Sequence, residues 1–333
     1  MKIKQKPEDF RVEEVSRLEP GPQGPFSLYR LEKRGIGTLE AARAVGKRWR
    51  IPRGDVAFAG LKDTHGHTGQ MLTVRGGPRR NLEGDRWKLN YLGRSSEPAR
   101  RGTLVANDFR VVVRALDDPA RFVARVERAR EIGFPDYYDD QRFGSLRGTE
   151  GAFIAEALLR GDDEAALRLA LASPDRQDRA PVRKRKTTLR DHWGAWAAAV
   201  EALPESFERD VAQALADGAS FRAAYERIDK ELRRLHLAAY QSHLFNEEVR
   251  ARIPEGPSWP GVEGPYRFHE EPIENVALPL PVFPELPFRA GERALLCIPE
   301  SLQAEADGDA VALRFRLRPG SYATMLLKRG AVR

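Results

Sequence analysis

The spacing of apolar residues changes twice along this chain of 333 residues, and that change constrains the fold more than any other feature. Alternation with a period of two, typical of half-buried strands, occurs at residues 10–13, 26–31 and 311–317. Between these segments apolar residues recur every three or four positions, as in amphipathic helices. We therefore expect an α+β protein in which a mainly helical domain interrupts a domain with a mixed or antiparallel sheet.

The changes in composition also place the domain boundaries. We assign residues 1–147 and 293–333 to a discontinuous sheet domain and residues 148–292 to the inserted helical domain. Residues 254–287 hold 9 of the 23 prolines, which excludes a long helix there and predicts extended connections.

Capping residues and apolar stripes predict individual helices. Thr38 is expected to cap a helix over residues 39–48. Pro119 is expected to begin a helix that ends at Gly133. The clearest apolar stripe has helical spacing and predicts core positions; its members are Phe221, Tyr225, Ile228, Leu232 and Leu235.

The composition excludes several classes of protein. With 41% hydrophobic and 32% charged residues, the chain can form a core and is not a disordered protein. Its single cysteine, Cys297, excludes an internal disulfide and argues against a thiolate metal site. No segment approaches the ~20 apolar residues of a membrane span, and the N-terminus has no apolar signal region. We expect a cytoplasmic protein without membrane association.

Positive charge suggests a polyanionic partner. The formal net charge is +7, and Lys or Arg side chains that neutralise phosphates release condensed counterions. The most concentrated basic segment is the block Arg183, Lys184, Arg185 and Lys186. Such a block either contacts phosphates or forms a solvated face.

One polar loop has the features of a catalytic segment. The apolar run at residues 56–59 predicts a buried strand that ends at Gly60, and residues 71–74 predict the strand that leaves the loop. Asp63 lies between them, where a carboxylate either faces a cleft or caps a turn. His65 and His67 form a His-x-His pair, but no further ligands follow at recognisable spacing, so we expect no metal site and no cofactor.

Six motifs in this chain resemble those of the TruD family of pseudouridine synthases, in the family's order. The loop supplies the second motif, Phe58-Ala59-Gly60-Leu61-Lys62-Asp63 with Thr68 and Gln70. The others are Lys4 with Pro7-Glu8-Asp9-Phe10, Asn107-Asp108-Phe109, Tyr137-Tyr138 with Gln141-Arg142-Phe143-Gly144, Leu244-Phe245-Asn246, and Gly320-Ser321-Tyr322-Ala323-Thr324.

The resemblance implies both a fold and an activity. It implies a catalytic fold of the pseudouridine-synthase type, split by a helical insertion specific to the family. It also implies isomerisation of uridine to pseudouridine in tRNA, with uridine 13 as the expected position. Such a reaction breaks the N1–C1′ bond and joins C5 to C1′ without redox change. We expect tRNA as the partner and no obligatory protein partner.

The same resemblance assigns roles to individual residues. Asp63 occupies the position of the catalytic aspartate, as nucleophile or as acid/base. Lys4 occupies the position of the basic residue that pairs with it. The remaining positions are implied to bind the substrate; they are Phe10, Asp136, Tyr138, Tyr322, Gln141 and Arg142.

Departures from the family pattern leave alternatives open. Asp136 stands where the family usually has Asn, Tyr138 where it usually has Phe, and Gly66-His67 where it usually has a small apolar pair. An ionised aspartate only accepts hydrogen bonds, so recognition of the base edge could differ. The alternatives are a non-catalytic RNA-binding relative and a metal-assisted hydrolase built on His65, His67 and Asp63.

Overall fold

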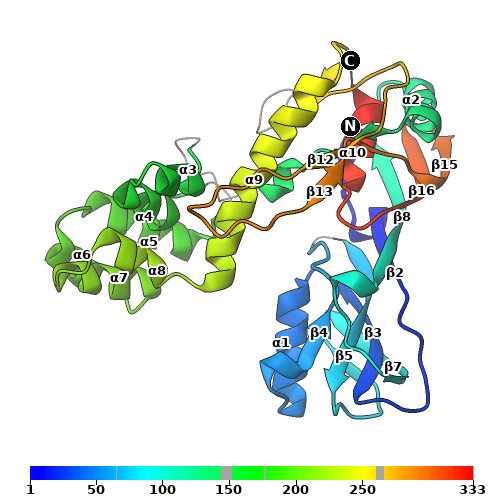
Figure 1. Cartoon of the computed structure of the whole chain (residues 1–333). Helices are drawn as coiled ribbons and strands as arrows, with labels where there is room; N and C mark the ends of the chain where they lie inside the picture. The colour runs from blue at the N-terminus through cyan, green and yellow to red at the C-terminus, as the bar shows by residue number, and fades with distance from the viewer. Residues whose placement is uncertain (65, 144–151, 176–177, 260–265, 333) are drawn as a thin grey trace. The chain divides into compact units, whose positions relative to one another are not determined.

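The computed structural model describes residues 1–64, 66–143, 152–175, 178–259 and 266–332 (Figure 1). The chain forms two compact units. Unit 1 comprises residues 1–135, 268–274 and 296–333, and unit 2 comprises residues 136–267 and 275–295. The expected boundary between residues 147 and 148 lies outside the described residues. The expected boundary between residues 292 and 293 falls within a strand of unit 2.

Unit 1 is built around one mixed sheet, in which ten strands of the described residues take part. The main strand order is β15-β16-β8-β2-β5-β3-β7-β6, with β1 added to β8 and β4 added to β5. The bounds are β1 Lys2–Ile3, β2 Phe10–Ser16, β3 Phe26–Arg34, β4 Val56–Phe58, β5 His67–Arg75, β6 Leu82–Gly84, β7 Trp87–Ser95, β8 Leu104–Arg114, β15 Glu300–Asp307 and β16 Ala310–Leu317.

Besides the sheet and short 3-10 turns, the described part of unit 1 contains three α-helices and a short strand pair. These are α1 Thr38–Trp49, α2 Pro119–Ile132 and α10 Ala323–Ala331, with β9 Phe134–Pro135 paired to β14 Leu296–Cys297. The buried face of α1 packs Ala41 and Val45 into a core with Leu31, Leu72 and Leu89 of the sheet. Pro119 begins α2 and Gly133, at φ 73°, ends it, as the sequence predicts.

The prediction that Thr38 caps α1 is wrong. Thr38 is the first residue of the helix, and Gly37 occupies the N-cap position without a side-chain hydrogen bond. The Thr38 hydroxyl instead donates to Gln70 Oε1 at 2.8 Å and accepts from Lys62 N at 3.0 Å. The side chain that suits a helix cap is used to hold the loop that contains Asp63.

Unit 2 is mainly helical. The bounds are α3 Ile154–Leu159, α4 Asp163–Leu171, α5 Ala180–Asp191, α6 Trp196–Ala202, α7 Phe207–Ala216, α8 Phe221–Glu226 and α9 Lys230–Arg252, with the short strands β10 Ser258–Trp259, β11 Tyr266–Arg267, β12 Ala277–Pro279 and β13 Glu292–Ala294. Its core joins apolar residues of α3 to α9. The α+β class, with a large sheet and a mainly helical unit, is confirmed.

The apolar stripe at residues 221–235 does not form one helix. Asp229 accepts hydrogen bonds from Glu231 N and Leu232 N, so it caps α9 and separates that helix from α8. Leu232 and Leu235 are therefore exposed by 40% and 41% rather than buried. Among the described residues, none of the helices combines the length and apolar character that crossing a bilayer requires.

Candidate active site

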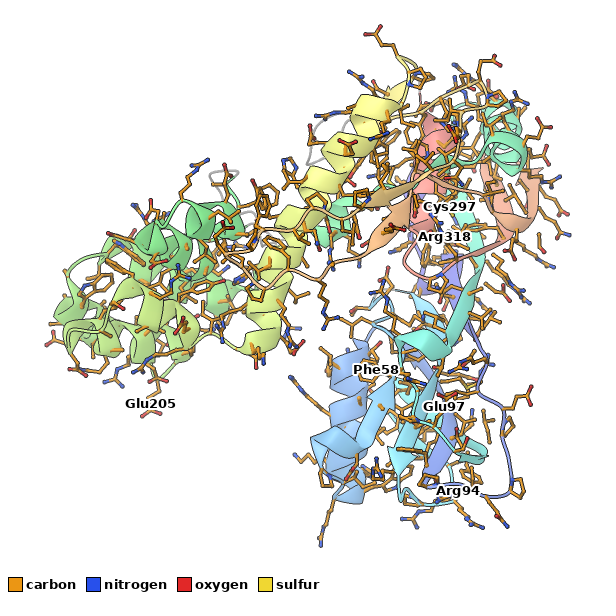
Figure 2. The ribbon with its side chains drawn as sticks, viewed as in Figure 1. Phe58, Arg94, Glu97, Glu205, Cys297 and Arg318 are labelled. Atoms are coloured by element: carbon orange, nitrogen blue, oxygen red, sulfur yellow. The ribbon has the colours of Figure 1, made fainter. Side chains whose placement is uncertain are left out.

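The sheet topology of unit 1 brings the first two motifs together. Strands β2 and β5 are parallel neighbours, with Val12 opposite Thr68. Segments that precede parallel neighbours lie at the same end of the sheet. Lys4 precedes β2, and Asp63 precedes β5. The loop of Asp63 begins after β4, whose last residue, Phe58, is marked in Figure 2.

Lys4 connects the carboxylate to an aromatic ring. Its ammonium forms an ion pair with Asp63, and Nζ lies 4.3 Å from the centroid of the Phe10 ring. The Lys4 backbone has φ 60°, a left-handed conformation that costs a non-glycine residue about 1 kcal/mol. The side chains of Lys4 and Asp63 are exposed by 20% and 11%, so water screens this pair little. The arrangement places an ionised carboxylate beside a cation–π contact.

An ion pair holds the N-terminal segment that carries Lys4. Asp9 is 3% exposed and accepts from Arg114 of β8 through both carboxylate oxygens, at 2.8 to 3.3 Å. The Arg114 guanidinium holds the pKa of Asp9 below its ordinary value. Lys6 N also donates to Asp9 Oδ2 at 3.1 Å. Asp9 of the first motif therefore has a structural role: it holds the segment that carries Lys4.

Lys33 anchors the Asp63 loop from beneath. This residue of β3 is 2% exposed, and its ammonium donates to the carbonyl of Asp63 at 2.6 Å. It also donates to the carbonyls of Ile36 and Lys62, at 3.0 and 3.3 Å. Burial lowers the pKa of Lys33 to about 8, and the charge of Asp63 opposes that effect. The loop is thus fixed through its backbone by a buried cation.

Two further side chains hold the loop from the side. Gln70 Nε2 donates to the carbonyl of Gly60 at 3.1 Å, while Gln70 Oε1 accepts from Thr38. Thr38 also accepts from Lys62 N. Backbone groups on both sides of Leu61 are therefore bonded to buried side chains.

Lys62 belongs to a separate buried network. Its side chain is 7% exposed and lies 3.2 Å from Glu14 Oε2, and it donates to Asn107 Oδ1 at 2.7 Å. Burial raises the pKa of Glu14, and the Lys62 charge partly offsets this. The adjacent loop residues Lys62 and Asp63 therefore form ion pairs with different partners. Asp63 pairs with Lys4, and Lys62 pairs with Glu14.

The aromatic residues of unit 1 take different positions. Phe10 is 4% exposed and packs edge-on against Phe109, with 6.1 Å between ring centroids. A Cβ at Gly66 would approach the Phe10 carbonyl oxygen to 2.8 Å. Gly66, which stands where the family usually has a small apolar residue, therefore lets the backbone of the loop lie close to Phe10. Tyr322 is half-buried at the N-cap of α10.

In unit 2, Asp136 and Tyr138 share a partner that sequence reasoning missed. Asp136 is 1% exposed, and its carboxylate lies 2.9 Å from Arg293 Nη2. Arg293 Nε donates to the Asp136 carbonyl at 2.7 Å. The same guanidinium lies over the Tyr138 ring, with Cζ 4.2 Å from the centroid. The acid that replaces the family's usual Asn is therefore matched by a buried cation.

Tyr138 and Arg142 of the fourth motif contact α9, whereas Gly144 lies outside the described residues. Asn246 accepts from Tyr138 N and donates to the Tyr138 carbonyl, both at 2.8 Å. Arg142 Nε donates to Ser242 at 3.2 Å, and its Cζ lies 5.6 Å from the Tyr138 centroid. Gln141 is exposed. The motif around Asn246 thus fixes the backbone of the fourth motif.

The basic block lies on α5, and most of it has partners within unit 2. Arg185 pairs with Glu208, and Lys186 pairs with Asp178, each at 2.9 Å. Arg183 donates to the carbonyls of residues 175 and 178. Lys184 is exposed. Contact of Arg185 or Lys186 with a phosphate would compete with these ion pairs.

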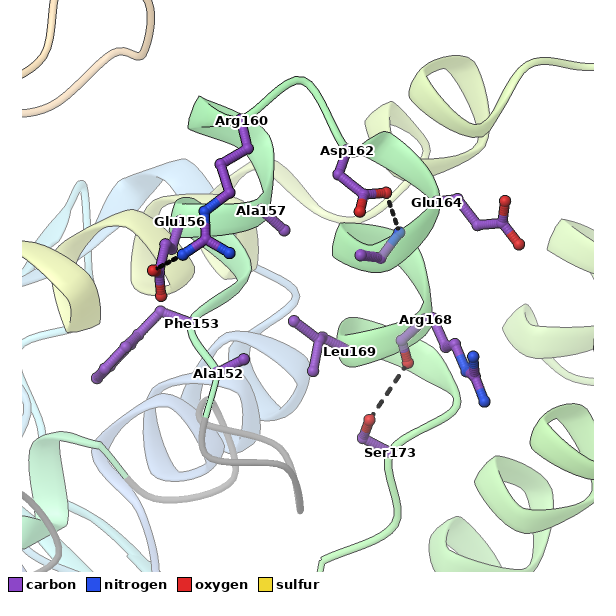
Figure 3. Close-up of a pocket in the computed structure, with 11 residues that line it drawn as sticks. Ala152, Phe153, Glu156, Ala157, Arg160, Asp162, Glu164, Arg168, Leu169 and Ser173 are labelled. Atoms are coloured by element: carbon purple, nitrogen blue, oxygen red, sulfur yellow. Dashed lines mark hydrogen bonds and ion pairs between the residues drawn. The ribbon is translucent and has the colours of Figure 1, made fainter.

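A pocket of about 330 Å³ in unit 2 is lined by α3 and α4 (Figure 3). Three of its charged side chains have local partners: Glu156 pairs with Arg160, and Asp162 caps α4 through Ala165 N at 2.9 Å. No site residue expected from the sequence lines this pocket. The described residues contain no cluster of three or more His, Cys, Asp or Glu side chains that could hold a metal ion. His65 of the His-x-His pair lies outside them.

Comparisons with known proteins assign the chain to a family. The family described as tRNA pseudouridine synthase D (TruD) matches residues 1–265, which is well over half of the chain. The chain belongs to the TruD family of tRNA pseudouridine synthases.

Two relatives and one solved structure agree with this assignment. The "Probable tRNA pseudouridine synthase D 1" of Methanococcus maripaludis is 32% identical over 77% of this chain and 67% of its own length. The tRNA pseudouridine synthase D of Aquifex aeolicus is 33% identical over 74% of this chain and 65% of its own length. The chain therefore spans about two thirds of these relatives. A crystal structure from Methanosarcina mazei that carries the TruD name has a TM-score of 0.67 and 21% identity, over 99% of this chain and 93% of that one, which supports the fold.

Proposed function

We propose that this protein isomerises uridine to pseudouridine in tRNA, with Asp63 as the catalytic residue and uridine 13 as the target. The observation that supports this most strongly is the pairing of Asp63 with Lys4 on a loop anchored by Lys33. We further propose that unit 1 is the catalytic domain, that unit 2 is the family-specific insertion, and that the protein acts in the cytoplasm.

The chemistry asks for an ionised carboxylate in a partly dry site. Breaking N1–C1′ and forming C5–C1′ involves no net redox change, so one acidic residue can serve as nucleophile or as acid/base. The Lys4 ammonium favours the ionised form of Asp63, and Phe10 supplies an aromatic surface beside the pair. A uridine held there has to leave its stack in the RNA.

Several other residues are proposed to bind RNA. Tyr322 belongs to the same unit as Asp63, and a tyrosine ring offers a stacking surface for a base. In unit 2, Tyr138, Gln141 and Arg142 are proposed to contact the RNA. Asp136 is proposed to act on Tyr138 through Arg293, because that guanidinium contacts both side chains.

The test is pseudouridine formation in tRNA incubated with the purified protein, followed by mass spectrometry and chemical mapping of the modified position. We expect one pseudouridine, at position 13, formed by the wild type. Asp63→Asn should bind tRNA with unchanged affinity but form none, because the amide keeps the shape of the side chain and loses its charge and nucleophilicity. Asp85→Asn, at an exposed aspartate of the same unit, is the matched control and should react normally.

The outcomes separate the alternatives. Turnover by Asp63→Asn above the no-enzyme background would remove Asp63 from the catalytic role. A wild type that binds tRNA but forms no pseudouridine would identify an RNA-binding relative. A wild type that forms no pseudouridine but shows a hydrolytic activity that a chelator abolishes would favour the metal-assisted hydrolase.

A further inference from the structure

Leu61 is an apolar side chain in an unusual place. It is 62% exposed, the highest value among the exposed large hydrophobic residues of the described chain. It lies two residues before Asp63, so the two Cα atoms are at most about 7 Å apart. Single exposed leucines are common on protein surfaces. Leu61 differs from other exposed leucines because it lies beside a candidate catalytic carboxylate.

The loop cannot withdraw Leu61 without breaking several hydrogen bonds. On one side, the Gly60 carbonyl accepts from Gln70. On the other side, Lys62 N donates to Thr38, and the Lys62 carbonyl accepts from Lys33 at 3.3 Å. Since each of these partner side chains is buried, the backbone on both sides of Leu61 is fixed. The leucine is therefore held outward by the same bonds that position Asp63.

An outward apolar side chain next to the reacting group suits one step of the proposed reaction. When a uridine leaves its stack, the bases on either side lose an apolar contact, and a gap opens between them. Proteins that open base steps commonly insert Leu, Ile, Met or Phe into such a gap. A short distance between the flipped nucleotide and the gap requires the wedge and the catalytic residue to lie close together, as Leu61 and Asp63 do.

We propose that Leu61 is the wedge that enters the RNA stack where the target uridine leaves it. This inference rests on the proposed function, since it needs a uridine that is flipped towards Asp63. Leu61 acts as a positioning residue: it touches the neighbours of the target base and holds the open state. Burying its exposed surface in the stack should be worth about ten-fold in the equilibrium for flipping, or ~1.4 kcal/mol.

The test compares two readouts on tRNA that carries 2-aminopurine next to the uridine that the wild type modifies. Fluorescence of 2-aminopurine rises when its neighbour unstacks, and single-turnover formation of pseudouridine measures the reaction. Leu61→Ala should slow single-turnover formation about ten-fold and reduce the fluorescence change. Leu61→Met should restore most of both signals, because its side chain can fill the same gap. Leu92→Ala, which removes an exposed leucine of β7 in the same unit, should match the wild type.

Two results would overturn the inference. One is an unchanged rate and fluorescence change in Leu61→Ala. The other is a slower rate with an unchanged fluorescence change, which would place Leu61 in a step other than base flipping. Failure of the proposed function is distinct from both, because the wild type itself would then form no pseudouridine.

Discussion

Replacement of Lys33 by Met tests how a buried ammonium positions the loop that carries Asp63. Methionine has a similar length and volume but donates no hydrogen bonds, so Lys33→Met leaves the carbonyls of Asp63, Ile36 and Lys62 without the ammonium. The loop then keeps the backbone contacts made by Thr38 and Gln70, and its side chains keep the ion pairs of Asp63 with Lys4 and of Lys62 with Glu14. We expect pseudouridine formation to fall about 10- to 100-fold, because a displacement of about 1 Å at a reacting group has effects of that size.

The effect of Lys33→Met on the free energy of unfolding combines two contributions that oppose each other. Each buried carbonyl left without a donor costs about 1–3 kcal/mol. A pKa of about 8 in the folded protein, against 10.5 for an ordinary lysine, corresponds to about 3 kcal/mol by which burial disfavours the ammonium. The three carbonyls together would cost about 3–9 kcal/mol, and removing the charge recovers about 3 kcal/mol, so the free energy of unfolding at pH 7 should fall by up to about 6 kcal/mol.

The pH dependence gives the sharper test, and its sign follows from proton binding. Below pH 8 the lysine is protonated in both the folded and the unfolded states, and the full cost of burial is present. Between pH 8 and 10.5 the unfolded chain binds more protons than the folded protein, so the wild type gains stability as the pH rises. From pH 7 to pH 10 the gain should be about 2–3 kcal/mol, and Lys33→Met should lack it.

Urea unfolding followed by tryptophan fluorescence measures this difference, because Trp49 and Trp87 lie in unit 1. Wild type and Lys33→Met are compared at pH 7 and pH 10. Lys47→Met, at an exposed lysine of α1, is the control and should follow the wild type. A stability difference between wild type and Lys33→Met that stays constant from pH 7 to pH 10 would refute a buried ammonium beneath the loop.

Two further predictions concern unit 2. Asp136→Asn should lower the free energy of unfolding by about 1–3 kcal/mol, because Arg293 loses a carboxylate and keeps only a neutral acceptor; an unchanged urea midpoint would contradict this. Lys184→Ser should reduce the slope of log tRNA affinity against log salt by about 0.7–0.9, whereas Arg185→Ser should mainly destabilise the unit by breaking its pair with Glu208. A slope for Lys184→Ser equal to that of the wild type would assign this lysine to a solvated face.

Sequence reasoning found the parts of the site that lie in short local patterns. The apolar run before Gly60 predicts β4, and the carboxylate after it marks the loop. The motif around Lys4 predicts its pairing with Asp63, which the structure contains. The apolar run at residues 71–74 predicts that the loop ends at residue 70, whereas β5 begins at His67. Strand ends of this kind depend on pairing with β2 and β3, which are distant in sequence.

Other features depend on long-range contacts and leave no local signal. Lys33 lies in a polar stretch at the end of β3, a pattern typical of a solvent-facing residue, yet its ammonium donates to the carbonyls of Lys62 and Asp63 about 30 residues away. Arg293 follows a proline-rich segment and contacts Asp136, 157 residues away. Threonine is a common helix cap, but the Thr38 hydroxyl instead bonds to Gln70 and to the backbone N–H of Lys62.

The lysines of the candidate site show how a buried cation can be retained near a reacting carboxylate. Lys4 faces Asp63 and Lys62 faces Glu14, so each of these two charges is matched by an opposite charge. Lys33 is matched mainly by carbonyl dipoles, which compensate desolvation less completely, and its pKa falls accordingly. Those carbonyls lie in place only while the loop is ordered. The ordered loop therefore lowers the pKa of the lysine that it covers, so a rise in pH that neutralises Lys33 removes the cost of burying its charge while it weakens the hydrogen bonds to those carbonyls.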